Sequence, residues 1–563
     1  MAGDRIIRTC KRLLLPLAGL GLVVPFAAQA DLSAYVRARA AAADGAVDAA
    51  AIGYAAAMAS APGDAVVAMR AYRNALASGD LVLARRAAAV MTKGGVAPAD
   101  VSVLDLAHAI RTGDRAAADD ALGRIGAGPL DFLAPVIRAW LAFGRGADPF
   151  AILDNAKAGG LSQRYIAEHR ALLLIAANRA PESLAALRAA LAAEPGNLDL
   201  RWNAALLLAS KGERAVALTL LAGDHSELVA MRANLRRGVN ANAAFGASRA
   251  LTRLAADLAG QQTQALSILL TRAALSLDPR HDRARMLLAD ALRQEGAVGS
   301  ALATLGEVRR DGGFYEQAQA ERIELIKARG EGESALAIAA TLASRGDARA
   351  SEKQRYADLL VEQGREAEAA RIYAAVLNEA GKDATWIHHL QLGGALERTG
   401  QWQAALPHLR RAVELAPDQP VALNYLGYAL VDRGESLNQG QALLERASAL
   451  RPDDPAITDS LGWAYFRLGD YTRALPLLER AAQGNPASPT INEHLGDIYW
   501  KAGRRVEARY AWRAAAIYAE GEQKGRIADK LAEGLRPDAT AGNKRTDVSG
   551  WAVAQGERWA TAN

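Results

Sequence analysis

Leu-Gly pairs recur along the last third of this chain at a nearly constant distance, within stretches rich in alanine and leucine. Each pair follows the previous one after about 34 residues, and a proline follows each of the first three pairs at a matching distance. A fixed period of this length is typical of solenoids, whose units bury their apolar faces against one another. The pattern therefore predicts stacked pairs of helices. The four pairs are Leu392-Gly393, Leu426-Gly427, Leu461-Gly462 and Leu495-Gly496, and the prolines are Pro417, Pro452 and Pro486.

The clearest unit, residues 455–488, resembles the tetratricopeptide repeat, a helix-turn-helix of about 34 residues. It has the L-G-x-x-Y sequence of the first helix, although Thr458 stands where the family has a tryptophan. The next unit keeps the pattern, with Trp512 at the large aromatic position, whereas Gly440 replaces the second-helix alanine in the unit before. The residues that carry the resemblance are Leu461, Gly462, Tyr465, Ala474, Leu478, Ala481 and Pro486.

The resemblance implies a structural reason for the residue type at each recurring position. Gly462 and Ala474 are expected where two helices cross closely, because a larger side chain would separate them. Prolines at the first helical position cost little, since that N–H has no acceptor within the helix. Asp454 and Ser488 precede two of them as N-caps. The expected first-position prolines are Pro420, Pro455 and Pro489, and Gly434, Gly469 and Gly503 are expected at the turns with positive φ.

With this register, the rest of the chain is interpreted as weaker copies. Turn glycines step back by the same interval through Gly364, Gly330 and Gly296. We therefore expect an all-α fold, a right-handed superhelical solenoid of about 14 repeats. The expected divisions are a degenerate array at 31–231, an intermediate array at 248–385 and a clear array at 386–522. The units start near residues 31, 65, 99, 130, 164, 198, 248, 282, 316, 350, 386, 420, 455 and 489.

Three further segments fall outside the repeats. Residues 232–247 lengthen one interval between units and contain three arginines and no acid, so they are either a joint between arrays or a basic insertion that faces a partner. Residues 523–536 are amphipathic, with Ile527, Leu531 and Leu535 on one face, and predict a capping helix. Residues 537–563 predict a disordered tail, in which Trp551 and Trp559 could form a docking motif.

The N-terminus has the pattern of a secretory signal peptide over residues 1–30. A basic stretch precedes the apolar run from Leu13 to Ala28, which ends in the small-x-small sequence Ala28-Gln29-Ala30. The run is short for a membrane span. We therefore expect cleavage before Asp31 and a periplasmic or secreted protein. The alternative is an uncleaved N-terminal membrane anchor.

Composition narrows the class of protein. The chain is 51% hydrophobic and 23% charged, which is ample for a core. Cleavage would remove its single cysteine, four basic residues and one acidic residue, so the net charge would fall from +5 to +2. That value gives no case for nucleic-acid binding. No other apolar stretch is long enough to span a bilayer, so the mature chain is expected to have no membrane span.

The sequence holds no recognisable catalytic constellation. Serine-nucleophile, phosphate-binding and zinc-protease motifs are all missing from the 563 residues. His388 and His389 are adjacent on an expected helix, so they point in different directions and cannot share a metal there. We therefore predict a protein that is not an enzyme and has no cofactor and no metal.

Binding is the positive expectation. In the family that the chain resembles, a concave groove is lined by fixed positions of each first helix. Large rigid rings among polar residues suit the recognition of a peptide. Alternatively, Trp463 and Trp500 pack between neighbouring units. Asn424 could belong to a clamp for a C-terminal carboxylate, but the matching lysines are missing, so that ligand is not predicted. The groove residues carried over are Asn424, Tyr428, Asp432, Asp459, Trp463, Phe466, Arg467, Glu493, Asp497, Trp500 and Lys501.

Three functions fit these features. The first is a non-catalytic adaptor in the cell envelope that binds proteins or peptides in the groove, for secretion, polysaccharide export or envelope assembly. The second is a scaffold that binds polysaccharide through the same aromatic residues. The third is an uncleaved, membrane-tethered assembly factor. The sequence predicts neither self-association nor a monomer.

Overall fold

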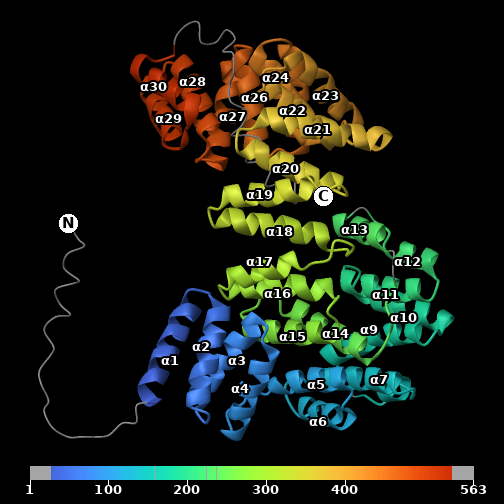
Figure 1. Cartoon of the computed structure of the whole chain (residues 1–563). Coiled ribbons are helices and arrows are strands. Elements are labelled where there is room, and N and C mark those ends of the chain that lie inside the picture. The colour runs from blue at the N-terminus through green and yellow to red at the C-terminus, as the bar shows by residue number, and fades with distance from the viewer. Residues whose placement is uncertain (1–26, 157–158, 224, 236–237, 536–563) are drawn as a thin grey trace, which may run out of the picture. The chain divides into compact units, whose positions relative to one another are not determined.

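The regular structure of the protein is helical throughout the part that can be described (Figure 1). The computed structural model describes residues 27–156, 159–223, 225–235 and 238–535. Within these residues it contains thirty α-helices and two short 3-10 helices, and no strand. The all-α prediction is confirmed. The chain divides into two compact units, residues 1–325 and 326–563, which we call the first unit and the second unit.

The first unit contains α1 to α17 and most of α18, because the division falls within α18. Its helices are α1 (Ala27–Ala43), α2 (Val47–Ser60), α3 (Ala65–Ser78), α4 (Leu81–Lys93), α5 (Val101–Thr112), α6 (Arg115–Gly126), α7 (Ala134–Gly144), α8 (Phe150–Asp154), α9 (Leu161–Ala176), α10 (Ala180–Ala193), α11 (Leu198–Ser210), α12 (Arg214–Leu220), α13 (Ser226–Asn234), α14 (Ala243–Asp257), α15 (Gln264–Leu277), α16 (Asp282–Gln294), α17 (Val298–Gly306) and α18 (Tyr315–Ala328), with a 3-10 turn at Asp131–Leu133.

The second unit contains α19 to α30. Its helices are α19 (Gly332–Ala343), α20 (Ala350–Glu362), α21 (Glu366–Ala380), α22 (Trp386–Arg398), α23 (Trp402–Leu415), α24 (Pro420–Arg433), α25 (Leu437–Leu450), α26 (Pro455–Arg467), α27 (Tyr471–Gly484), α28 (Pro489–Lys501), α29 (Arg505–Tyr518) and α30 (Gly521–Glu533), with a 3-10 turn at Gly381–Asp383. Consecutive helices pack as pairs from α20 and α21 to α28 and α29, and α29 packs against α30.

The predicted register matches the helix starts at eight of the fourteen expected units. Expected units at 65, 198, 282, 350, 386, 420, 455 and 489 each coincide with the first residue of a helix. Asp454 accepts backbone N–H bonds from Ala456 and Ile457, and Ser488 accepts one from Ile491, as expected of N-caps. The six turn glycines of the register all have φ between 70° and 84°: Gly296, Gly330, Gly364, Gly434, Gly469 and Gly503.

Close helix crossings explain the small residues. A Cβ on Gly462 would lie 2.8 Å from Cγ of Leu478, and one on Gly496 would lie 2.3 Å from Cδ1 of Trp512. In the unit that departs from the family pattern, a Cβ on Gly440 would lie 2.8 Å from the carbonyl oxygen of Gly427. The helices of that pair therefore approach too closely for the alanine that the pattern contains.

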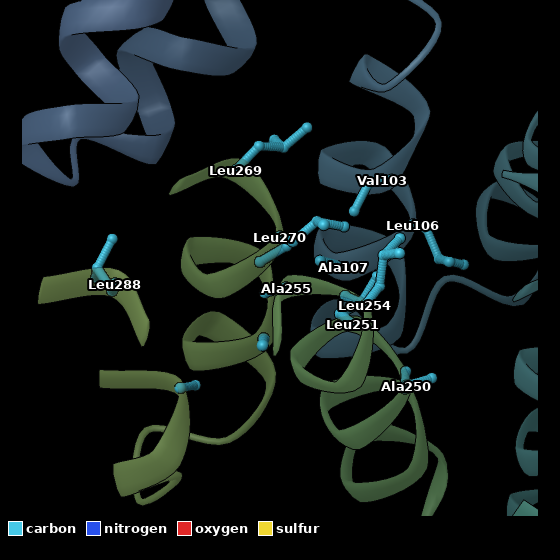
Figure 2. Close-up of a cluster of buried hydrophobic side chains, with 14 of the residues drawn as sticks. Val103, Leu106, Ala107, Ala250, Leu251, Leu254, Ala255, Leu269, Leu270 and Leu288 are labelled. Carbon is cyan, nitrogen blue, oxygen red and sulfur yellow. The ribbon is translucent and has the colours of Figure 1, made fainter. Parts of the chain in front are cut away.

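Packing in the first unit extends beyond helices that are neighbours in sequence. Helices α14 and α15 pack against α3, α5 and α7, which come much earlier in the chain. Figure 2 shows part of this core, in which Val103 and Leu106 of α5 lie beside Leu254 of α14 and Leu270 of α15. All four side chains are buried. The repeat phase gives no sign of these distant contacts.

A half-buried arginine joins two of these distant helices. The guanidinium of Arg272 in α15 donates to the carbonyl oxygens of Leu76, at 3.0 Å, and Ala77, at 2.7 Å. Both carbonyls belong to the last turn of α3, where they lack partners within the helix. Arg272 thus satisfies a helix end that would otherwise be buried with unpaired acceptors.

Several predictions lie at the edges of the described chain. Residues 1–26, most of the predicted signal peptide, lie outside it, as do residues 537–563 with Trp551 and Trp559. The predicted cleavage bond before Asp31 lies in the first turn of α1. None of the described helices has both the length and the apolar character needed to cross a membrane.

The arginine-rich segment 232–247 joins α13 to α14 within the first unit, with residues 236 and 237 outside the described chain. The guanidinium of Arg232 donates to the carbonyl oxygens of Leu221 and Gly223. This arginine therefore stabilises a local turn, which favours the interpretation of the segment as a joint.

Candidate protein-binding face of the second unit

The predicted site residues all lie on α24, α26 and α28, the first helices of three successive pairs. We call the surface that these three helices share the groove face. The part of the groove face on α24 and α26 and the part on α28 have different neighbours. Residues of α24 and α26 pack against the next first helix, whereas the start and middle of α28 pack against α30.

An aromatic stack forms the centre of the groove face. The ring of Trp463 lies parallel to that of His494 in the next unit, with centroids 4.0 Å apart, and to that of Phe466, 4.8 Å away. Tyr428 lies 6.4 Å from His494 between ring centroids. Trp463 and Phe466 are buried, as the alternative of packing between units predicts, and Tyr428 is half-buried.

His494 is held by an ion pair beneath the stack. Its Nδ1 lies 2.9 Å from Oδ2 of Asp459, and both side chains are almost fully buried. Burial by itself would lower the pKa of His494, but the Asp459 carboxylate, supported by Glu493 and Asp497, raises the pKa above the ordinary value of 6.5. The surrounding carboxylates of Asp459, Glu493 and Asp497 therefore favour the protonated form of His494.

The raised pKa predicts that the second unit loses stability as the pH rises. A group with a higher pKa in the folded state contributes stability that is fully present below its unfolded pKa, here 6.5. That contribution disappears as the pH rises through the folded pKa. The charged groups that face His494 are Asp459 of α26 and Glu493 and Asp497 of α28, with Lys530 of α30 behind them.

Titration of the His494 ring by NMR measures this effect directly, and a pKa above 6.5 is expected. Urea unfolding at increasing pH should show a falling free energy of unfolding, and a His494→Gln variant should lose that part of the slope. A His494 pKa below its ordinary value in the folded chain would contradict the prediction.

Helix α30 covers the acidic end of the groove face. Nζ of Lys530 lies 2.7 Å from both Oε1 of Glu493 and Oδ2 of Asp497, and Arg526 lies 3.6 Å from Glu493. Burial would raise the pKa of Glu493, but Lys530 and Arg526 outweigh it and lower that pKa. For Asp497 burial prevails and the pKa is raised. Lys530 lies off the apolar face that Ile527, Leu531 and Leu535 form on α30, but its ammonium group points into the protein.

The remaining candidates lie toward the ends of the three helices. Arg467 donates to the backbone carbonyl of Asp432 at 2.8 Å, which links α26 to α24. Trp500 is half-buried against Trp512, with the Arg505 guanidinium 5.0 Å from its ring centroid. Lys501 is half-buried at the end of α28 and makes no ion pair within the described chain.

Two polar groups on the groove face are buried without partners. Asn424 is fully buried, and neither its amide oxygen nor its amide nitrogen has a hydrogen-bond partner within the described residues. The indole N–H of Trp463 is buried and unpaired in the same way. An unpaired buried amide costs about 1–3 kcal/mol. Such groups are uncommon in a stable core. The Asn424 amide and the Trp463 indole N–H therefore retain unused hydrogen-bonding capacity.

The residues available to a partner are fewer than the sequence indicated. Tyr428, Arg467, Trp500 and Lys501 are half-buried, whereas six predicted contacts are buried: Asn424, Asp459, Trp463, Phe466, Glu493 and Asp497. The role of these residues in binding stays a prediction. Sequence reasoning missed His494 and Lys530. The only signal for His494 was that it follows Asp459 by about one repeat, and nothing in the amphipathic pattern singled out Lys530.

Metal-binding arrangements are sparse in the described residues. No group of three or more His, Cys, Asp or Glu side chains there could hold a metal ion. Nδ1 of His389 in α22 lies 3.1 Å from Nδ1 of His408 in α23, and both side chains are half-buried. His388 instead accepts the backbone N–H of Thr385 at the start of the same helix, so the adjacent histidines do point apart.

Comparison with known proteins agrees with this architecture. Residues 259–316 and 460–523 match one tetratricopeptide-repeat family and residues 387–429 match another. No curated protein sequence matches the chain at a significant level. The chain therefore contains tetratricopeptide repeats.

Several solved structures are similar to parts of the chain, and each covers about a third of it. A thermophilic tetratricopeptide-repeat protein of Thermus thermophilus is 22% identical, with 33% of this chain and 100% of that chain covered and a TM-score of 0.30. YrrB, described as having an unusual peptide-binding site, is 22% identical over 31% and 88%, with a TM-score of 0.25. MamA from Desulfovibrio magneticus RS-1 is 19% identical over 30% and 94%, with a TM-score of 0.26.

Proposed function

We propose that the protein is a non-catalytic adaptor of the cell envelope that binds partner proteins or peptides along the groove face of the second unit. Tetratricopeptide repeats serve as scaffolds for protein–protein interaction, and this much follows from the family. Export to the envelope, and a role in secretion, polysaccharide export or envelope assembly, are the finer parts of the proposal.

The observation that carries the proposal is the composition of the groove face. Half-buried Tyr428 and Trp500 provide rigid rings, and Arg467 and Lys501 provide charge at the edge. Aromatic anchors within a polar rim are the usual composition of a protein interface.

Affinity capture from envelope extracts tests the binding face. The bait is the mature chain beside a Tyr428→Ala/Lys501→Ala double variant, which leaves Trp463, Phe466 and the ion pair of His494 with Asp459 in the chain. Tyr510→Ala is the matched control, because Tyr510 is an exposed tyrosine on a second helix, α29. A protein that binds the parent and the control, and binds the double variant at least tenfold more weakly in calorimetry with purified components, is the expected result. Equal binding by all three baits would place the interface elsewhere.

Export has its own test. Cell fractionation of the source organism, with mass spectrometry of the purified chain, should find a periplasmic or secreted protein whose first residue is Asp31. An intact N-terminus in the membrane fraction would support the tethered alternative, and an intact cytosolic chain would contradict the envelope assignment.

A further inference from the structure

A cavity of about 540 Å³ lies within the first unit, and residues of α11, α14 and α16 contribute to its lining. Its walls come from Trp202 of α11, from residues 238–245, from the loop between α15 and α16, and from the loop after α17. Residues 238–245, which include the end of the loop between α13 and α14 and the start of α14, thus contribute one wall. Its volume falls in the range of about 300–1,000 Å³ that is typical of small-molecule sites.

The charges that line the cavity neutralise one another. Arg249 pairs with Asp278. Arg309 lies 3.0 Å from a carboxylate oxygen of Asp282 and 3.1 Å from one of Asp311. The carboxylate of Asp311 also lies 3.9 Å from the Arg280 guanidinium. Three arginines therefore face three aspartates.

This pairing selects against a charged ligand. Arg249 and Asp282 are almost fully buried, so an anion or a cation that reached either of them would have to displace its partner and leave that partner uncompensated, which is costly where groups are desolvated. Burial, followed by the neighbouring arginines, holds the pKa of His281 well below its ordinary value, so this ring adds no charge at neutral pH. A ligand without net charge avoids the cost.

The remaining polar groups are fixed donors and acceptors. Asn242 accepts the backbone N–H of Phe245 at 2.8 Å, which leaves its amide nitrogen for another partner. Asn240 is exposed at the wall. A ligand that meets these amides and the ion pairs together must donate and accept at many points, and each hydroxyl group does both.

An aromatic surface completes the cavity. Trp202 is partly buried and contributes its ring to the lining, whereas the face of Phe245 is covered by the Arg249 guanidinium, 4.2 Å from the ring centroid. The ring of Trp202 can therefore pack against the C–H face of a sugar while the polar groups bind its hydroxyls.

We propose that this cavity binds a short, neutral oligosaccharide. Trp202 packs against a sugar ring, Asn240 and Asn242 bind hydroxyl groups, and the Arg–Asp pairs supply further donors and acceptors. The proposal is independent of partner binding by the groove face, because every lining residue belongs to the first unit.

Calorimetry and tryptophan fluorescence on the full chain test the proposal. The probes are maltotetraose, cellotetraose and chitotetraose as neutral sugars, tetragalacturonic acid as an acidic sugar, and tetraglycine capped at both ends as a peptide backbone. At least one neutral sugar is expected to bind with a dissociation constant below about 1 mM, the affinity that corresponds to about −4 kcal/mol.

Variants then locate the bound sugar. Trp202→Ala should weaken binding at least tenfold, and Asn240→Ala, at an exposed position that leaves the fold intact, should weaken it severalfold. Asn155→Ala is the matched control, because this exposed asparagine at the end of α8 lies outside the cavity, and it should bind as the parent does.

Several outcomes would overturn the proposal. Failure of all three neutral sugars to bind would do so, as would equal binding by the parent and Asn240→Ala. Tighter binding of tetragalacturonic acid than of every neutral sugar would show that the ligand is an anion. Tighter binding of the capped tetraglycine would assign the cavity to a peptide.

Discussion

Replacing Lys530 with methionine is expected to destabilise the second unit by about 3–5 kcal/mol at neutral pH. Methionine preserves the apolar stem but removes the ammonium that lies 2.7 Å from both Glu493 and Asp497. The two carboxylates would then remain buried on one helix, and the basic groups left near them would be Arg526, 3.6 Å from Glu493, and His494. Removing one partner of a buried ion pair costs more than the pair contributes, because the other charge stays desolvated.

Urea unfolding, followed by circular dichroism, measures the loss, and hydrogen exchange in α30 shows whether that helix detaches first. Lys524→Met is the matched control, since Lys524 is exposed on the same helix, and it should change stability by less than about 0.5 kcal/mol. The deficit of Lys530→Met should shrink as the pH falls, because protonation neutralises the unpaired carboxylates. A Lys530→Met variant as stable as Lys524→Met would show that the ion pairs do not hold α30.

Replacing Gly246 with alanine is expected to destabilise the first unit by about 3 kcal/mol or more, at the upper end of what overpacking costs. A Cβ at this position of α14 would lie 1.9 Å from Cγ of Trp140 in α7. Trp140 is fully buried, and its indole N–H donates to Nδ1 of His169 at 2.9 Å. Burial, with Arg253 nearby, lowers the pKa of His169 to about 3, so this ring is a neutral acceptor at neutral pH. The tryptophan can therefore move away only by breaking a buried hydrogen bond.

Gly123→Ala is the control for the general effect of alanine in a helix. Gly123 lies within α6 with no neighbouring atom in reach of a Cβ, so its replacement should stabilise the first unit by about 0.5–1 kcal/mol. A Gly246→Ala/Trp140→Leu double variant should be less destabilised than the sum of its two single changes, because both act on one contact. Thermal unfolding of the four variants and the parent measures this, and an unchanged melting temperature for Gly246→Ala would contradict the close crossing.

The candidate binding face was partly predictable. The resemblance placed all its residues on the first helices of three pairs, and that placement is correct. It did not indicate which of them reach the surface, because exposure depends on what packs above each helix. Asp459 and Trp463 lie below His494, and Glu493 and Asp497 lie below Lys530. His494 is not one of the residues that carry the repeat pattern, and Lys530 lies in the capping helix beyond the repeats.

The helical repeats, their register and their turns could be predicted from the sequence. Positive φ at Gly434 or Gly469, proline at the first turn and the caps at Asp454 and Ser488 depend on a few consecutive residues, and such requirements recur visibly with the period. The packing of α14 and α15 against α3, α5 and α7 is visible only in the three-dimensional fold. Those contacts join alanine- and leucine-rich faces far apart in sequence, and such faces are too alike to name their partners. The burial of Lys530 has the same origin, since an amphipathic pattern shows that a lysine is polar but not that two carboxylates lie beneath it.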